Sequence, residues 1–375
     1  MRAGRPLTGI QRVTLNSLIG AWERLGSSGV KVIFYDKSAG RFLVCDVEQL
    51  LRPNCSDHQG SCNFQKADCV ILSEYLWDTT VANATLQRKN FGPARLYRLV
   101  YDVIPLAMPK LSPWTWAYKF RRFISGCIEN ADCVITISDF SKSDIQKYFP
   151  RECQNKPIHV LKLPHEFIGV QTILELAGFG AKNLKTEHAE RALVSEPFVL
   201  MVGSIDERKN QLGAIEAWQK LFLKHGNKLP KLVFVGGLSS HGYFFKAKIR
   251  RALKQTDKFI HLAECDDDGL RWLYQNCQFS IFISHYEGWG LPVGESLWFG
   301  KPVISARTTS LPEVGEDYAD YVDADNEAEL LAKIELMCFD QNYPIGRAER
   351  IDHQKLWTWE KFSEKMLNCI NGGQF

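Results

Sequence analysis

Residues 285–295 constrain the fold more than any other part of the chain. They follow an apolar run at residues 279–284 and hold three glycines and a proline between two carboxylates, Glu287 and Glu295. Pro292 fits the first turn of a helix, because its missing N–H costs nothing there and its φ is already helical. The stretch therefore predicts a β-strand, a tight glycine loop and a helix, with Glu295 in the first helical turn.

This predicted unit is suited to binding a phosphate. The free N–H groups of a helix N-terminus point at a bound anion, and the helix dipole favours negative charge there. A carboxylate one turn further on, Glu295, can accept hydrogen bonds from a ribose diol, and Glu287 in the loop can face the group beyond the phosphates. The alternative is two solvated glutamates. Because the glycines, the proline and the apolar run agree with one another, the pattern favours a nucleotide with a further group attached.

The length and composition indicate a soluble protein with two α/β domains. A chain of 375 residues is too long for one ordinary core. A net charge of +3 argues against a nucleic-acid binder, which would show a dominant basic face. We expect a cytoplasmic location, because the chain has no apolar run long enough to span a membrane and no signal peptide. Its eleven cysteines are expected to be reduced thiols.

Apolar strands alternate with helical patterns along both halves of the chain, which predicts parallel sheets covered by helices on both faces. A linker is expected at about residues 161–196. We therefore expect an N-terminal Rossmann-like domain (residues 1–180), a C-terminal one (residues 190–350) and a C-terminal segment (residues 351–375) with a helix from about 359 to 370. The expected strands are residues 30–35, 69–72, 96–104, 133–137, 198–203, 232–235, 259–262 and 301–305.

Two adjacent cations, Arg208 and Lys209, follow the strand that ends near Gly203. A pair of cations can neutralise a diphosphate, and the fork of an arginine suits phosphate oxygens. The alternative is a solvated charged turn. Their place after a strand, in the same half as the Glu287 loop, makes the two interpretations about equal.

Several motifs together resemble a known family. They are residues 202–210, 287–295 and 311–314 in the C-terminal half, and residues 8–13, 101–105 and 131–138 in the N-terminal half. Together they resemble the family-4 retaining glycosyltransferases of the GT-B fold. The chain is most similar to bacterial transferases of surface-polysaccharide assembly, many of them mannosyltransferases. The resemblance is highly specific in the C-terminal half and moderate in the N-terminal half.

The resemblance implies two Rossmann-like parallel-sheet domains that face each other across a cleft, with the donor bound by the C-terminal domain. It also implies a nucleoside-diphosphate sugar as donor, a glycan or lipid-linked acceptor, front-face attack without a protein nucleophile, and no cofactor or metal. The C-terminal helix would pack back on the N-terminal domain. The implied catalytic residues are Glu287, Arg208, Lys209 and Asp102, and the implied donor-binding residues are Glu295, Gly288, Trp289, Gly290, Leu291, Gly203, Gly9 and Tyr101.

Two departures from the family pattern keep other functions open. Only eight residues precede Gly9, so the first strand of the N-terminal domain is expected to be missing, and Tyr101 stands where many relatives have histidine. Asp102 is expected to take the polar role instead. The alternatives are a non-catalytic GT-B scaffold or binding protein and a sugar-nucleotide epimerase, although no acid–base residues for the latter are evident.

Two further segments have competing interpretations. Three aspartates beginning at Asp266 could bind a metal, but the apolar spacing after them favours a helix N-cap. Residues 114–123 mix aromatic and cationic side chains, which permits a peripheral contact with the inner face of the plasma membrane. The alternative there is a partly buried helix with a basic outer face.

Overall fold

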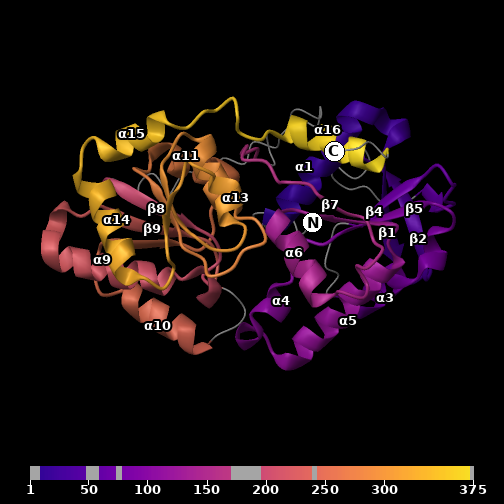
Figure 1. The fold of residues 1–375 in the computed structure, drawn as a ribbon, viewed down its shortest axis with the longest axis horizontal. Helices are drawn as coiled ribbons and strands as arrows, with labels where there is room; N and C mark the ends of the chain where they lie inside the picture. The colour runs from indigo at the N-terminus through magenta and orange to yellow at the C-terminus, as the bar shows by residue number, and fades with distance from the viewer. Residues whose placement is uncertain (1–8, 48–58, 73–77, 170–195, 239–242, 372–375) are drawn as a thin grey trace. The chain divides into compact units, whose positions relative to one another are not determined.

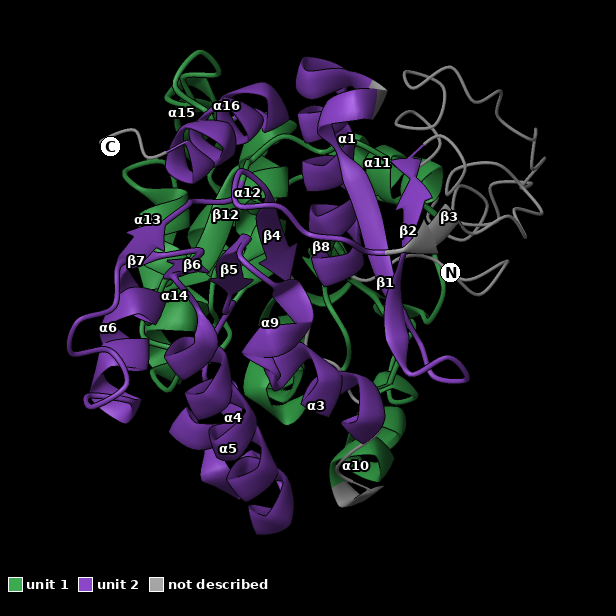
Figure 2. Cartoon of the chain, turned by 90° about the vertical axis from the view of Figure 1, so that its right-hand side faces the viewer, with its two compact units in different colours: residues 1–6, 164–169, 182–357 green, residues 7–163, 170–181, 358–375 purple. Residues whose placement is uncertain are grey.

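The computed structural model describes residues 9–47, 59–72, 78–169, 196–238 and 243–371 (Figure 1). The chain divides into two compact units, drawn in separate colours in Figure 2. Unit 1 comprises residues 1–6, 164–169 and 182–357, and unit 2 comprises residues 7–163, 170–181 and 358–375. Most of the expected linker, residues 170–195, lies outside the described residues.

Unit 1 is built on a six-stranded parallel sheet in the order β10-β9-β8-β11-β12-β13. The chain builds one half outward from β8 and the other outward from β11, so the strand order reverses between these two neighbours. In open α/β sheets, ligands bind at the carboxyl ends of the strands beside such a reversal. The strands are β8 (Phe198–Val202), β9 (Lys231–Val235), β10 (Phe259–Leu262), β11 (Ser280–Phe282), β12 (Val303–Ala306) and β13 (Asp320–Val322).

Helices cover both faces of the unit 1 sheet. Val199 and Met201 of β8 join the core cluster that holds Trp218 of α9. Leu200, between them, joins a second cluster with Tyr274 of α11, as the alternation of a strand requires. The helices are α9 (Gln211–His225), α10 (Tyr243–Leu253), α11 (Asp267–Asn276), α12 (Leu291–Trp298), α13 (Leu311–Gly315), α14 (Glu327–Phe339) and α15 (Tyr343–Glu349).

Unit 2 contains a four-stranded parallel sheet in the order β4-β5-β6-β7. Its strands are β4 (Cys69–Leu72), β5 (Arg95–Leu99), β6 (Cys133–Thr136) and β7 (Ile158–Val160). The prediction of a strand over residues 96–104 was too long, because β5 ends at Leu99 and Pro105 lies in the first turn of a helix. The helices are α3 (Thr79–Leu86), α4 (Ile104–Ala107), α5 (Trp114–Asn130) and α6 (Asp139–Tyr148).

The expected strand at residues 30–35 exists, but its assignment to a parallel sheet was wrong. β1 (Lys31–Asp36) pairs antiparallel with β2 (Arg41–Asp46), and β2 pairs with β3 (Gln59–Ser61) in a separate three-stranded sheet. Only four residues join β1 to β2, whereas a parallel pair needs a crossover of a dozen or more. The turn closes with the N–H of Gly40 donating to the carbonyl of Asp36 at 2.8 Å.

The first and last helices of the chain both belong to unit 2. α1 (Gly9–Gly29) is interrupted at Gly26, where φ is +70°, and α16 (Trp359–Ile370) packs against it. A Cβ on Gly20 of α1 would lie 2.0 Å from Oγ of Ser363 in α16, so the two helices approach closely at this glycine. No helix among the described residues is long and apolar enough to span a membrane.

Candidate functional site

The loops that follow β8 and β11 bring together a carboxylate and two cations. Nη1 of Arg208 lies 2.6 Å from Oε1 of Glu287, and Nζ of Lys209 lies 2.8 Å from the same oxygen. All three side chains are largely buried. β8 and β11 flank the reversal of strand order. The sheet therefore places this charge cluster at the edge where ligands of such folds bind.

Glycine at position 203 makes room for the lysine of the cluster. Gly203 has φ of +144°, and a Cβ there would lie 2.9 Å from Cδ of Lys209. Gly236, which follows β9, has φ of +138°, and a Cβ there would lie 2.4 Å from the carbonyl oxygen of Gly203. The loops after β8 and β9 thus approach each other more closely than residues with side chains permit.

Asn210 fixes the backbone directly after the two cations. It adopts the left-handed conformation with φ of +56° and caps α9, with its Oδ1 accepting from the N–H of Gly213 at 3.2 Å. Its Nδ2 donates to the carbonyl of Ala324 at 2.9 Å. Asn210 ends the motif at residues 202–210, but its role as a cap was not predicted, although an asparagine just before a helix is a recognisable N-cap.

The Glu287 loop is held by the segment that follows β12. The N–H of Glu287 donates to Oγ1 of Thr309 at 3.0 Å, and Oγ of Ser310 donates to the carbonyls of Glu287 and Trp289, each at 2.9 Å. The N–H of His285 donates to the carbonyl of Arg208 at 2.8 Å, which joins the two loops. Thr309 and Ser310 were not predicted as site residues, since neither is near Glu287 in sequence.

The charges of the cluster keep Glu287 ionised. Burial by itself raises the pKa of Glu287, but the charges of Arg208 and Lys209 outweigh burial and lower that pKa to about 2. Glu287 is therefore a carboxylate at neutral pH and can accept hydrogen bonds but not donate a proton. Burial lowers the pKa of Lys209, whereas the neighbouring carboxylate of Glu287 favours its charged form. With both cations protonated, the three side chains carry one net positive charge, which favours an anionic ligand.

The second carboxylate, Glu295, lies in α12 but not in its first turn, which corrects the sequence prediction. The helix begins at Leu291 with Pro292 in the first turn, as predicted, so Glu295 falls in the following turn. Its side chain is buried, and its Oε2 accepts a hydrogen bond of 2.8 Å from the hydroxyl of Tyr274. The ring of Tyr274 is stacked on Phe299 with 5.5 Å between the ring centres. Tyr274 was missed because it lies on another helix, α11.

The remaining predicted donor-binding residues of unit 1 surround this helix start. Gly290, with φ of +115°, precedes α12, and a Cβ there would lie 2.4 Å from Cδ2 of Leu311. Trp289 is buried. Nine of the predicted site residues therefore belong to this one unit: Arg208, Lys209, Gly203, Glu287, Gly288, Trp289, Gly290, Leu291 and Glu295.

Three predicted site residues, Asp102, Tyr101 and Gly9, belong to unit 2. Oδ1 of Asp102 accepts from the N–H of Ile104 at 3.0 Å, at the start of α4. Tyr101 is buried, with 3% of its surface exposed. Gly9 is the first residue of α1.

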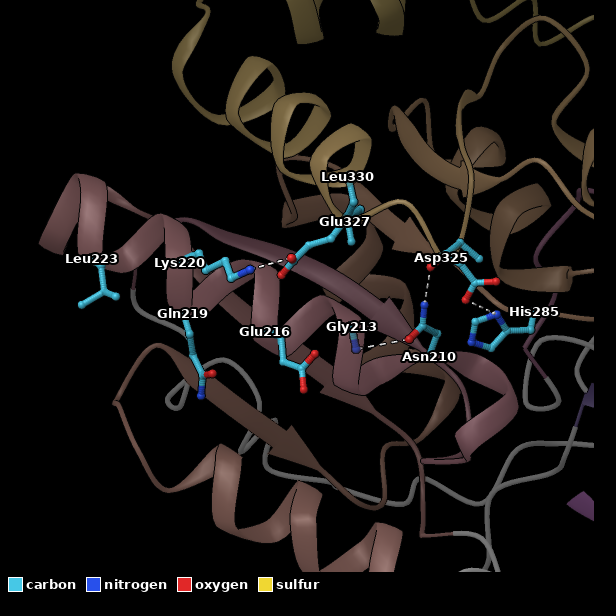
Figure 3. Close-up of a pocket in the computed structure, with 11 residues that line it drawn as sticks. Asn210, Gly213, Glu216, Gln219, Lys220, Leu223, His285, Asp325, Glu327 and Leu330 are labelled. Carbon is cyan, nitrogen blue, oxygen red and sulfur yellow. Dashed lines mark hydrogen bonds and ion pairs between the residues drawn. The ribbon is translucent and has the colours of Figure 1, made fainter. Parts of the chain in front are cut away.

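A groove of about 660 Å³ lies between α9 and the start of α14 in unit 1 (Figure 3). His285 lies 3.6 Å from Asp325 across one end, and Lys220 pairs with Glu327 further along. Asn210 and His285 connect the groove to the two loops, but none of the predicted site residues lines it.

The acidic run beginning at Asp266 is a helix cap. Oδ1 of Asp266 accepts from the N–H of Gly269 at 2.8 Å, and Asp267 and Asp268 lie in the first turn of α11, which confirms the N-cap prediction. Within the described part of the chain, no group of three or more histidine, cysteine, aspartate or glutamate side chains is arranged to hold a metal ion.

Known structures share this fold. Sucrose-phosphate synthase from Thermosynechococcus elongatus matches with a TM-score of 0.58 at 18% identity, covering 78% of this chain and 71% of that one. HepE from Anabaena, solved with UDP and glucose, matches with a TM-score of 0.60 at 14% identity, covering 81% and 77%. With its Rossmann-like units, the protein has the fold of the GT-B glycosyltransferases.

A family model and proteins related in sequence indicate which glycosyltransferases this chain is similar to. Residues 185–351 match the family model "Glycosyl transferases group 1". O-antigen chain mannosyltransferase B of Escherichia coli is 24% identical over 291 residues, covering 74% of this chain and 71% of the relative. Serotype-specific mannosyltransferase WbdA of Escherichia coli is 25% identical over 374 residues, covering 97% of this chain but only 44% of WbdA. Residues 185–351 therefore carry a group 1 glycosyltransferase domain, and the resemblance of the motifs to glycosyltransferases of the GT-B fold is confirmed to that extent.

Proposed function

We propose that this protein is a retaining, metal-independent hexosyltransferase, with mannose as the first candidate for the transferred sugar. The donor is a nucleoside-diphosphate sugar, and the acceptor is a glycan or lipid-linked acceptor in bacterial polysaccharide or lipopolysaccharide assembly. The names of the two Escherichia coli relatives support the choice of mannose and of the pathway.

The observation that carries the proposal is the cluster of Arg208, Lys209 and Glu287 at the carboxyl edge of the unit 1 sheet. Two cations beside a strand-order reversal suit a diphosphate. In this assignment Glu287 accepts hydrogen bonds from hydroxyls of the donor sugar, and Glu295, oriented by Tyr274, accepts them from the ribose.

The proposed reaction exchanges one bond to the anomeric carbon for another. The bond from that carbon to the diphosphate oxygen breaks, and Arg208 and Lys209 neutralise the charge that develops on the leaving diphosphate. The acceptor hydroxyl attacks the same face of the sugar and gives its proton to the leaving phosphate oxygen. Glu287 does not supply that proton, because its low pKa keeps it ionised.

The proposal also gives roles to three residues of unit 2. Asp102 and Tyr101 would contact the sugar, and Gly9 would let backbone approach the phosphates. We place the protein in the cytoplasm, peripheral at the inner face of the plasma membrane, where a lipid-linked acceptor would be held.

A thermal-shift panel with GDP, UDP, ADP and their sugar conjugates tests the donor assignment, because a ligand that binds only the folded state raises the melting temperature. We expect one nucleotide series to shift it. Glu295→Ala should reduce that shift, whereas Arg208→Ala should chiefly lower turnover. Unchanged donor affinity and turnover in both variants would show that the site is assigned wrongly.

Product analysis tests the stereochemistry and the metal independence. The anomeric configuration of the product, read by NMR, should match that of the donor. EDTA should leave activity unchanged. Inversion of configuration, or activity lost to EDTA and restored by manganese, would each refute the corresponding part of the proposal.

A further inference from the structure

Helix α5 of unit 2 has one buried face and one exposed aromatic face. Phe120, Ile124 and Ile128 are buried in the core. Trp114 and Tyr118, four residues apart and so on one side of the helix, are 79% and 57% exposed. Most of the other exposed large apolar side chains of the described residues are aliphatic and lie on other helices. Two exposed aromatic rings one turn apart therefore mark this face as unusual.

The segment that holds these two rings contains cations but no acidic residue. Lys119 and Arg122 lie on the same helix, Lys110 precedes it, and no aspartate or glutamate occurs between Asp102 and Glu129. The guanidinium of Arg122 lies over the ring of Tyr118, 5.9 Å from its centre. Within the described residues, no carboxylate pairs with Lys110, Lys119 or Arg122. The face thus combines exposed aromatic surface with uncompensated positive charge.

The exposure of two of the rings favours a membrane contact over a partly buried helix, although Phe123 also packs against the core. A partly buried helix with a basic outer face would turn its aromatic residues inward, and only Phe120 does so fully. Trp114 points outward instead, together with the cations. Tryptophan and tyrosine favour the interface between membrane and water, where one part of the ring is apolar and the polar group remains hydrated.

We propose that a docking face made by Trp114, Tyr118, Lys119 and Arg122 binds the surface of an anionic phospholipid bilayer. The two rings enter the headgroup region and the two cations contact lipid phosphates. The occupant is a bilayer rather than a protein, because the charge is of one sign and the exposed apolar residues are interfacial aromatics. This inference rests on the peripheral location proposed above and specifies the side chains and the lipid class.

The docking face lies near the proposed site residue Asp102 within the same unit. α4, whose first N–H donates to Asp102, packs against α5. Leu106 of α4 contacts the core cluster that holds Phe120. Figure 2 shows α4 and α5 together at one edge of unit 2. Docking through α5 would therefore bring the helix that follows Asp102 close to the membrane that holds a lipid-linked acceptor.

Co-sedimentation of the full chain with vesicles tests the proposal. We expect binding to vesicles of phosphatidylcholine mixed with phosphatidylglycerol, weaker binding at high salt, and little binding to phosphatidylcholine alone. Lys119→Gln with Arg122→Gln should lower partitioning about fivefold for each cation removed. Trp114→Ser with Tyr118→Ser should also lower it, whereas Arg122→Lys should retain binding because the charge remains.

The matched control changes an exposed apolar residue and an exposed cation of unit 1, Leu223→Ser with Lys228→Gln, and should bind like the wild type. No binding of the wild type to anionic vesicles, or equal binding by the Lys119/Arg122 variant, would overturn the proposal. The thermal shift with donor nucleotides needs no lipid. A lost vesicle interaction with an intact nucleotide shift would therefore refute the docking face and leave the transferase proposal standing.

Discussion

Nζ of Lys209 lies 2.8 Å from Oε1 of Glu287, although 78 positions separate the two residues. Arg208 contacts the same oxygen at 2.6 Å. The cations proposed for the diphosphate are therefore held by the carboxylate proposed for the donor sugar. A bound diphosphate and Glu287 must then compete for the same two cations.

Replacing Glu287 with glutamine should have opposite effects on binding and on turnover. Without the carboxylate, Arg208 and Lys209 are available to phosphate oxygens, so we expect affinity for the bare nucleoside diphosphate to rise about three- to tenfold. Turnover of the nucleotide sugar should fall, because a contact to the donor sugar is weakened. Isothermal titration with the product nucleotide and steady-state kinetics measure the two effects.

The control for this experiment is Glu207→Gln. Glu207 is exposed in the same loop and forms no ion pair with either cation, so its removal changes the net charge equally. It should leave both quantities nearly unchanged. Weaker product binding by Glu287→Gln would contradict the competition.

Removing the hydroxyl of Tyr274 should weaken nucleotide binding through Glu295. Tyr274→Phe keeps the stacked ring and deletes one hydrogen bond to the carboxylate, so we expect a loss of about five- to tenfold in affinity. Because the effect acts on the ribose contact, it should disappear with a 2′,3′-dideoxynucleoside diphosphate. Tyr343→Phe, which deletes a partly buried hydrogen bond to Asp320 in the same unit, should not alter nucleotide affinity. Equal losses with both nucleotides would indicate a merely structural role.

Alanine at Gly236 should destabilise unit 1. A Cβ there would meet the backbone of Gly203 at 2.4 Å, and φ is +138°, so we expect a loss of about 2–4 kcal/mol in the free energy of unfolding. Gly346→Ala is the control, because nothing lies within 4 Å of a Cβ in that helical position. It should be neutral or slightly stabilising. Urea unfolding of both variants measures these changes. An unchanged free energy of unfolding in Gly236→Ala would contradict the close approach.

The low pKa of Glu287 predicts a specific loss of stability in acid. The pKa falls from an ordinary value near 4.5 to about 2 on folding, so the ionised form stabilises the fold above the ordinary value. That contribution is lost as pH falls from about 4.5 toward 2, and it amounts to at most about 3 kcal/mol. Urea unfolding at neutral pH and near pH 3 should show a larger loss for the wild type than for Glu287→Gln. Equal losses would show that Glu287 does not titrate in this way.

The sequence predicted features that depend on residues a few positions apart. Pro292 at the start of α12 and Asp266 as the cap of α11 are local choices, because the conformation of a helix end is set by its own first turn. The strand at residues 30–35 was found, but its sheet was misassigned, since the apolar pattern of one strand does not say which strand pairs with it.

Local patterns along the chain were enough to predict most of the elements, the GT-B class and the residue types of the candidate site. Three contacts could be seen only in the folded protein: Arg208 and Lys209 share one oxygen of Glu287, Thr309 and Ser310 hold its loop, and Tyr274 contacts Glu295. No local pattern predicts them, because each contact joins different strands and helices. The contacts follow from the strand order β8-β11-β12 and from the core cluster that α11 shares with Trp298 of α12. Both depend on residues far apart in the chain.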